Sequence, residues 1–197
     1  MKMKKGLMFL AVAMMFVFVF AGCASAPAAD AGKAGAAVTT GSAGVPLWNF
    51  ESNTTDGWHG NGKWGKRMTV NADPKFVTEG KYSLKIDATG CTGWNQDVAI
   101  FDGPFNDSFG KFTSISMDVI VPKESIAGID YAQIFVVISG AANSWYQVPQ
   151  GLKEGVNKLV YAIDNSNTSG DLWHMYLVFN SGKPFTGPVY IDNVTGK

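Results

Sequence analysis

The stretch from Phe112 to Val121 reads Phe-Thr-Ser-Ile-Ser-Met-Asp-Val-Ile-Val and places apolar side chains at every second position. Successive side chains of a β-strand point to opposite faces of the sheet, so this alternation predicts a strand with one face toward an apolar core. The expected core face carries Ile115, Met117, Val119 and Val121, and the opposite face carries Ser114, Ser116, Asp118 and Ile120.

Segments of the same kind lie on both sides of this strand. They are short, rich in β-branched and aromatic residues, and separated by Gly, Asn, Asp and Pro residues. Such spacing is typical of an antiparallel β-sandwich, and no window has the period of an amphipathic helix. We therefore expect an all-β fold with at most one helical turn, at residues 123–126. The expected strands span residues 47–51, 66–71, 82–87, 95–101, 112–121, 131–138, 143–148, 157–163, 172–179 and 188–194.

The amino terminus has the pattern of an export signal. Lysines at positions 2, 4 and 5 precede an uncharged apolar run over residues 7–20, which leads to Ala21-Gly22-Cys23. The run of 14 residues is too short to cross a bilayer comfortably. The segment ending at Cys23 resembles the lipobox of bacterial lipoproteins, which implies cleavage before this cysteine and a lipid on its thiol. Ordinary secretion, with cleavage near Ala24-Ser25-Ala26, is the alternative.

Cleavage before Cys23 predicts three parts of the chain. Residues 1–22 are the signal peptide, residues 23–45 are the lipidated cysteine and a linker, and residues 46–197 are one domain. Residues 24–45 contain 9 Ala, 4 Gly and no aromatic residue, so they cannot bury enough apolar surface to offset the entropy of ordering. The remaining stretch of about 150 residues is long enough to bury a core.

Charge and cysteine content argue against several classes of protein. Because Lys2, Lys4 and Lys5 lie in the signal, 13 of the 16 basic residues remain against all 16 acidic ones, a net charge of −3. Binding of nucleic acid phosphates requires a basic surface, so nucleic acid is not an expected partner. If Cys23 is acylated, Cys91 has no cysteine partner, and we expect neither a disulfide nor a cysteine metal cluster. The sequence leaves the oligomeric state open.

Three motifs follow one another along the domain. The first is Leu47-Trp48-Asn49-Phe50-Glu51 with Asp56-Gly57-Trp58, the second is the segment 77–86, and the third is the segment 187–194. Together they resemble the jelly-roll carbohydrate-binding modules attached to bacterial cellulases, xylanases and mannanases, within the galactose-binding-like superfamily. The resemblance covers residues 46–197 and implies a jelly-roll sandwich, but it does not specify the sugar.

The same resemblance implies a structural calcium ion beside the first and last strands. Glu51 and Asp192 would supply carboxylates, and the backbone around Gly80 and Ser83 would supply carbonyl oxygens. Calcium takes about six to eight oxygen ligands of these kinds. The alternative is that Asp192 caps a turn and Glu51 is a solvated strand residue.

Aromatic and amide side chains indicate a sugar-binding surface. Aromatic rings stack on the apolar faces of sugars, and the chain has 6 Trp, 6 Tyr and 13 Phe residues. In the segment 172–180, alternation assigns Trp173, Met175, Leu177 and Phe179 to the core and His174, Tyr176 and Asn180 to the opposite face. For every candidate, a core or plain surface role is the alternative. The predicted groove is lined by Trp94, Gln96, Asp118, Gln133, Trp145, Gln147, His174 and Tyr176.

The glycine-rich loop over residues 56–65 is a second candidate region, because loops that carry large side chains often bind ligands. We expect Trp58 to plug one end of the sandwich and keep Trp64 as a candidate contact.

Enzyme signatures are absent from the sequence. There is no Gly-x-Ser-x-Gly elbow, His-Glu-x-x-His helix or phosphate loop, and the two histidines lie in no recognisable triad. Paired carboxylates hydrolyse glycosides, but no spacing singles out a pair. We therefore expect a non-catalytic, glycan-binding lipoprotein of the bacterial cell envelope, at the outer membrane or cell surface. An envelope-assembly protein that uses the sandwich for protein contacts is the alternative, and a small glycan-active hydrolase ranks third.

The lipidation hypothesis has a direct test. Replacing Cys23 with Ser removes the thiol that would carry the lipid, so Cys23→Ser is expected to yield an unprocessed precursor without an acyl label. Metabolic labelling with a fatty acid and immunoblotting measure both. Normal processing to a soluble product would establish ordinary secretion instead.

Overall fold

A computed structural model describes residues 44–62, 65–102, 112–140, 144–163 and 172–197. These residues belong to one compact unit that spans Thr40–Lys197. No helix within the described ranges is long and apolar enough to cross a membrane. The helical content of the same ranges is confined to short 3₁₀ turns, among them η2 (Pro74–Phe76) and η3 (Lys123–Ile126). The turn η3 confirms the one expected at 123–126, whereas η2 was not expected.

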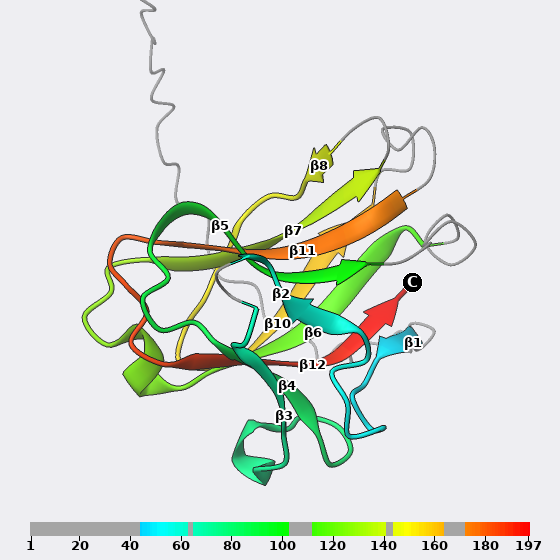
Figure 1. The fold of residues 1–197 in the computed structure, drawn as a ribbon, viewed down its shortest axis with the longest axis horizontal. Coiled ribbons are helices and arrows are strands. Elements are labelled where there is room, and N and C mark those ends of the chain that lie inside the picture. Colours follow the sequence, from blue (N-terminus) through cyan, green and yellow to red (C-terminus); the bar gives the residue numbers. More distant parts are fainter. Residues whose placement is uncertain (1–43, 63–64, 103–111, 141–143, 164–171) are drawn as a thin grey trace, which may run out of the picture. The chain divides into compact units, whose positions relative to one another are not determined.

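Two antiparallel sheets form the domain, and Figure 1 shows them as facing layers. Within the described residues, sheet A has the order β10-β6-β12-β4-β3, with β1 also paired to β12. Sheet B has the order β2-β5-β11-β7-β8, with β9 also paired to β7. The strands are β1 (Val45–Trp48), β2 (Trp58–Gly60), β3 (Met68–Asn71), β4 (Ser83–Asp87), β5 (Gly93–Asp102), β6 (Ser114–Val121), β7 (Ala132–Gly140), β8 (Ser144–Tyr146), β9 (Gln150–Gly151), β10 (Gly155–Ala162), β11 (Leu172–Ser181) and β12 (Pro188–Gly196).

The predicted antiparallel β-sandwich is confirmed, and all ten expected strands are present with shifted ends. Consecutive strands repeatedly cross between the sheets, which is the connectivity of a jelly roll. The short strands β2 and β9 were not expected. They are three and two residues long, too short to leave an alternating pattern in the sequence. The placement of Glu51 on the first strand was wrong, because β1 ends at Trp48 and Glu51 lies in the following turn.

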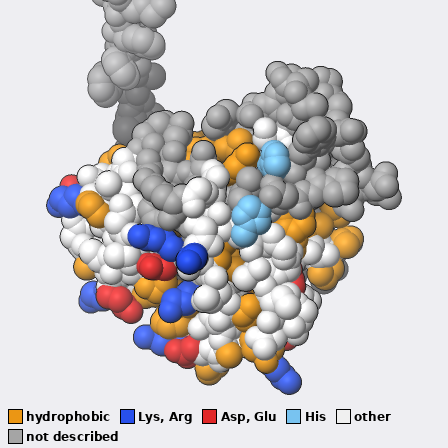
Figure 2. Space-filling view, viewed as in Figure 1, with side chains coloured by type: hydrophobic (Ala, Val, Ile, Leu, Met, Phe, Trp, Pro, Cys, Tyr) orange, Lys and Arg blue, Asp and Glu red, His pale blue; other side chains and the backbone are white. Residues whose placement is uncertain are grey.

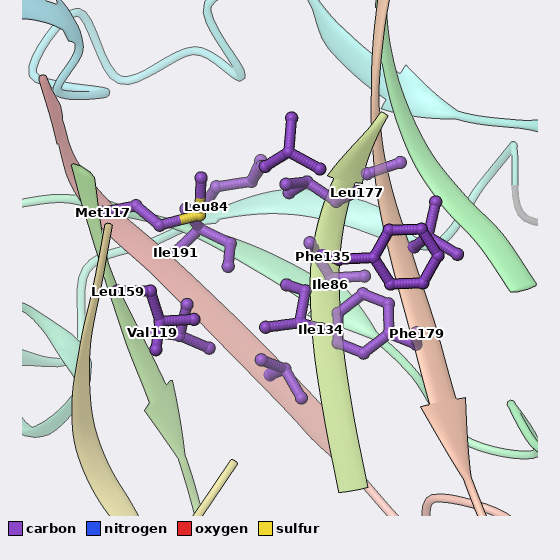
Figure 3. Packing of buried hydrophobic residues seen from close by; sticks show 14 of the residues in the cluster. Leu84, Ile86, Met117, Val119, Ile134, Phe135, Leu159, Leu177, Phe179 and Ile191 are labelled. Carbon is purple, nitrogen blue, oxygen red and sulfur yellow. The ribbon is translucent and has the colours of Figure 1, made fainter. Parts of the chain in front are cut away.

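The core lies between the sheets and is built from the alternate positions of each strand (Figure 3). In β6, Ile115, Met117, Val119 and Val121 are buried, as the alternation predicts. Sheet B contributes Met175, Leu177 and Phe179 from β11, together with Ile134, Val136 and Ile138 from β7.

Polar and aromatic contacts join the two sheets at particular points. The buried hydroxyl of Tyr161 in β10 donates a hydrogen bond to the carbonyl of Ile134 in β7 at 2.9 Å, and burial raises the pKa of this phenol. Trp58 of sheet B packs edge-on against Trp48 of sheet A, with ring centroids 5.1 Å apart. Phe101 completes this aromatic cluster, 4.8 Å from Trp48. The predicted core role of Trp58 is confirmed.

The burial of Leu177 generates a stability prediction. This side chain is 1% exposed, whereas Val160 of β10 is 59% exposed. Leu177→Ala is expected to lower the free energy of unfolding by about 2–5 kcal/mol, because it leaves a cavity among rigid neighbours. Val160→Ala serves as the control and is expected to change it by less than about 0.5 kcal/mol. Denaturant titrations measure both, and equal effects would contradict the assignment of Leu177 to the core.

Candidate functional site

Directly opposed residues of antiparallel strands lie on the same face of the sheet. The register of sheet B therefore defines rows of residues that run across the strands, and neighbouring rows lie on opposite faces. One row includes the buried Trp58, Ile138 and Met175 and faces sheet A. The next row along the strands faces away from sheet A, on what we call the outer face of sheet B. Among the described side chains, the core-facing row contains Trp58, Phe101, Met175 and Ile138. The outer row contains His59, Tyr176 and Val137.

The outer face carries the two histidines and several of the predicted binding residues. His59 is exposed, and His174 and Tyr176 are half-buried. The rings of His174 and Tyr176 lie 5.9 Å apart at an interplanar angle of 48°. Figure 2 shows both histidine side chains of the protein on one surface of the molecule. The face therefore combines flat rings with groups that hydrogen-bond.

Gln133 of β7 adds an amide group to the outer face, and Gln147 lies at the edge of the sheet beside the core residue Val136. Gln133 is half-buried and lies opposite Asn180 of β11. The backbone N–H of Gln147 donates to the carbonyl of Val136 at 3.0 Å, which extends the pairing beyond β8. The side-chain Nε2 of Gln147 is buried and has no hydrogen-bond partner among the described residues. A buried donor of this kind gains free energy when a ligand oxygen accepts from it.

Part of the outer face of sheet B is apolar and inaccessible to solvent. Phe135 and Val178 lie directly opposite each other, and both are buried together with Val137. Figure 3 shows Phe135 and Ile134 on opposite sides of β7, so Phe135 points away from the core between the sheets. Asn180, which we expected on the groove side of β11, is also completely buried. Alternation placed Asn180 on the side of β11 opposite the core but did not reveal how much of that side is covered.

The structure separates Asp118 from the other predicted groove residues, so this part of the prediction was wrong. Asp118 lies in β6 of sheet A, whereas the remaining predicted strand residues lie in sheet B or next to it. Both of its carboxylate oxygens accept from the ammonium of Lys158 at 3.0 Å. Alternation predicts the face of one strand but not which sheet the strand joins.

The backbone register places Trp145 of β8 opposite Ile138 of β7, and Gln96 of β5 opposite Phe179 of β11. The side chains of Trp94, Gln96 and Trp145, and the whole of Trp64, lie outside the described part of the structure.

His59 is the site residue that the sequence did not reveal. It follows Trp58 in a glycine-rich segment, so the pattern predicts a loop at this position. Pairing of β2 with β5 makes it a strand residue and brings it into line with Tyr176 across a single intervening strand. The available signal was the Trp-His pair itself, because a buried Trp58 requires the next side chain of a strand to point outward.

The carboxylates of Glu51 and Asp192 hold one loop from two sides. Oε1 of Glu51 accepts the backbone N–H groups of Lys81 at 2.8 Å and Tyr82 at 2.9 Å. Oδ2 of Asp192 accepts those of Thr78 at 2.7 Å and Glu79 at 3.0 Å. The loop of residues 78–82 is therefore fixed at both ends by two carboxylates that lie far apart in the sequence.

Gly80 lies at the centre of this loop, and its conformation explains why glycine is needed. Its φ is +71°, and a Cβ built there would lie 2.4 Å from the carboxyl carbon of Glu51. The hydroxyl of Ser83, whose backbone was expected near calcium, donates to the carbonyl of Phe76 at 2.7 Å. The described residues contain no group of three or more His, Cys, Asp or Glu side chains suited to a metal ion. A calcium ion at this loop would take two carboxylates and otherwise backbone carbonyl oxygens, which suits its chemistry.

Comparison with known proteins identifies similar folds but no sequence family. No protein-family model matches the chain, and no curated protein sequence matches it. Solved structures do match, and carbohydrate-binding modules with a β-sandwich fold are prominent among them.

CBM27-1 of Caldicellulosiruptor saccharolyticus, solved with mannohexaose, has a TM-score of 0.53 and 19% identity, covering 74% of this chain and 92% of that one. A CBM28 specific for non-crystalline cellulose has a TM-score of 0.52 and 16% identity, covering 76% and 92%.

A third structure comes from work on promiscuous modules of the β-sandwich superfamily, with a TM-score of 0.51 and 16% identity. It covers 79% of this chain, and this chain spans 63% of its length. At these identities the likeness establishes the fold.

Proposed function

We propose that the protein binds a glycan chain without cleaving it and that the outer face of sheet B is the binding surface. The observation that carries this proposal is the alignment of His59, Tyr176 and His174 on one face, with the amide of Gln133 farther along the same face. Rings that are held by a sheet offer flat surfaces to the apolar face of a sugar at low entropic cost. Each aromatic contact contributes about 0.5–1.5 kcal/mol beyond the area it buries.

The fold adds support of a general kind. The similar solved structures include one module bound to mannohexaose and one specific for non-crystalline cellulose, and both of these ligands are chains of sugar units. A surface that runs across several strands suits an extended chain better than a single sugar. We therefore propose a linear polysaccharide or oligosaccharide as the ligand.

Tyr176 provides the sharpest test of this surface. Tyr176→Ala removes a half-buried ring from the outer face, so the affinity for the bound polysaccharide is expected to fall about tenfold or more, which corresponds to about 1.4 kcal/mol. Affinity electrophoresis against cellulose derivatives, xylan, glucomannan and β-glucan identifies the polysaccharide and measures the loss.

Val160→Ala on sheet A is the matched control and is expected to leave retardation unchanged, with thermal melts showing that both variants fold. Retardation of the unaltered chain by no polysaccharide would favour the alternative, a protein that uses the sandwich for protein contacts. Unchanged retardation of Tyr176→Ala would move the site away from this face.

We also propose that the binding domain is displayed at the bacterial cell envelope. The sequence up to Cys23 supports a lipid anchor, and several acyl chains hold a protein firmly because each buried CH₂ contributes about 0.8 kcal/mol. The Ala- and Gly-rich segment after the cysteine would connect the domain to this anchor.

Calcium at the loop 78–82 is a further proposal, and it concerns stability. The two carboxylates that hold this loop are the oxygen ligands that calcium prefers. The ion would reinforce the loop and take no part in binding a sugar.

Calcium removal has a measurable consequence. A ligand that binds only the folded state raises stability in proportion to the logarithm of its concentration over its Kd. We expect added calcium to raise the Tm of residues 40–197 relative to chelator, and Asp192→Ala to abolish that difference. Glu79→Gln, which leaves the loop-holding carboxylates in place, is the control. Identical melting curves with calcium and with chelator, for protein shown to be metal-free, would contradict the proposed calcium site.

A further inference from the structure

A small cavity of about 210 Å³ opens on the outer face of sheet A. Its walls come from the turn η2, from the end of β6 with the start of η3, and from the start of β10. Sheet A lies across the core from the outer face of sheet B, so this cavity is separate from the glycan surface proposed above. Nothing in the sequence pattern pointed to it, because its walls come from segments up to 81 residues apart, between Lys75 and Val156.

The floor of the cavity is apolar. Ile120 and Pro122 are buried, Phe76 is half-buried, and Val156 is 54% exposed. The ring of Phe76 stacks on Tyr190 with centroids 4.2 Å apart and planes at 8°, which fixes its orientation. The wall formed by η3 is anchored as well, because the buried hydroxyl of Ser125 donates to the carbonyl of Pro188 at 2.6 Å. The cavity is therefore formed before any ligand arrives.

The rim of the cavity is charged but balanced. Lys75, Lys123, Glu124 and Glu154 line it, and all four are exposed. The ammonium of Lys75 lies 5.1 Å from the centroid of the Phe76 ring, at the edge of the apolar floor. A cation or an anion would be attracted by one pair of these charges and repelled by the other. An uncharged ligand with several hydroxyls can accept from the lysines and donate to the glutamates.

The size of the cavity limits the ligand further. Sites for drug-sized molecules have volumes of about 300–1,000 Å³, and this cavity is smaller. At about 30 Å³ for each water, it displaces roughly seven waters, which suits one ring with hydroxyl substituents. We propose that this cavity is a second binding site, for a single uncharged sugar ring, whose apolar face lies on Val156 and Ile120 and whose hydroxyls bind the charged rim.

The test is a titration of residues 40–197, which contain every described strand and the core. Glucose, mannose, galactose and xylose are added one at a time while backbone amide signals are followed by NMR. Saturable shifts are expected at Lys123, Gly155 and Val156, with a Kd in the millimolar range, for at least one sugar.

Two valines of one strand supply matched variants. Val156 and Val160 lie on the same face of β10 and are 54% and 59% exposed, but only Val156 lines the cavity. Val156→Arg is expected to weaken sugar binding at least tenfold, whereas Val160→Arg leaves it unchanged. Glu154→Ala, an exposed rim substitution, gives a second measurement if Val156→Arg disturbs the strand.

Each outcome decides the proposal. Absence of shifts around the cavity with all four sugars would overturn it, and so would shifts that persist unchanged in both Val156→Arg and Glu154→Ala. Tyr176→Ala is expected to leave these shifts in place, because it alters only the outer face of sheet B. If polysaccharide binding fails while the chemical-shift changes around the cavity are seen, only the glycan surface of sheet B is ruled out. If polysaccharide binds and those changes are absent, only the cavity site is ruled out.

Discussion

The register of β11 between β5 and β7 is the constraint on which both the core and the candidate binding face depend. Side chains alternate strictly along a strand, so the pairing that sends Met175 and Leu177 into the core also sends His174 and Tyr176 outward. A slip of one residue would exchange the two sets and expose the buried side chains. The apolar core therefore positions the binding rings, although it never touches a ligand.

A second constraint ties distant parts of the chain together. The pairing of β1 with β12 brings Glu51, just beyond β1, and Asp192, within β12, to the same loop. Each carboxylate accepts two backbone N–H groups of the loop, and hydrogen bonds to a charged acceptor are stronger than those between neutral groups. The approach of Glu51 to Gly80 leaves no room for a side chain at that position. The loop is thus ordered by its acceptors and by the absence of a Cβ.

The two outer surfaces of the sandwich differ in chemistry because different elements border them. The outer face of sheet B combines rings and amides with a closed apolar part around Phe135 and Val178. On sheet A, the neighbouring turns η2 and η3 lie beside the sheet and border a small open cavity with balanced charge. The ion pair of Asp118 with Lys158 neutralises an acidic side chain that lies opposite Asp192 on the same sheet. One fold therefore presents an extended surface on one side and a small open cavity on the other.

The all-β class, the approximate strands and the core-facing side of each long strand could be predicted from the sequence alone. Alternation over eight or more residues, as in β6 and β11, is a local signal that does not depend on the partner strands. Which strands share a sheet follows only from the folded structure, and this separated Asp118 from Tyr176 and aligned His59 with Tyr176. The tertiary structure also produced the loop held by Glu51 and Asp192 and the cavity beside Val156. These features depend on pairings between residues that lie far apart in the chain, and no local pattern encodes such a pairing.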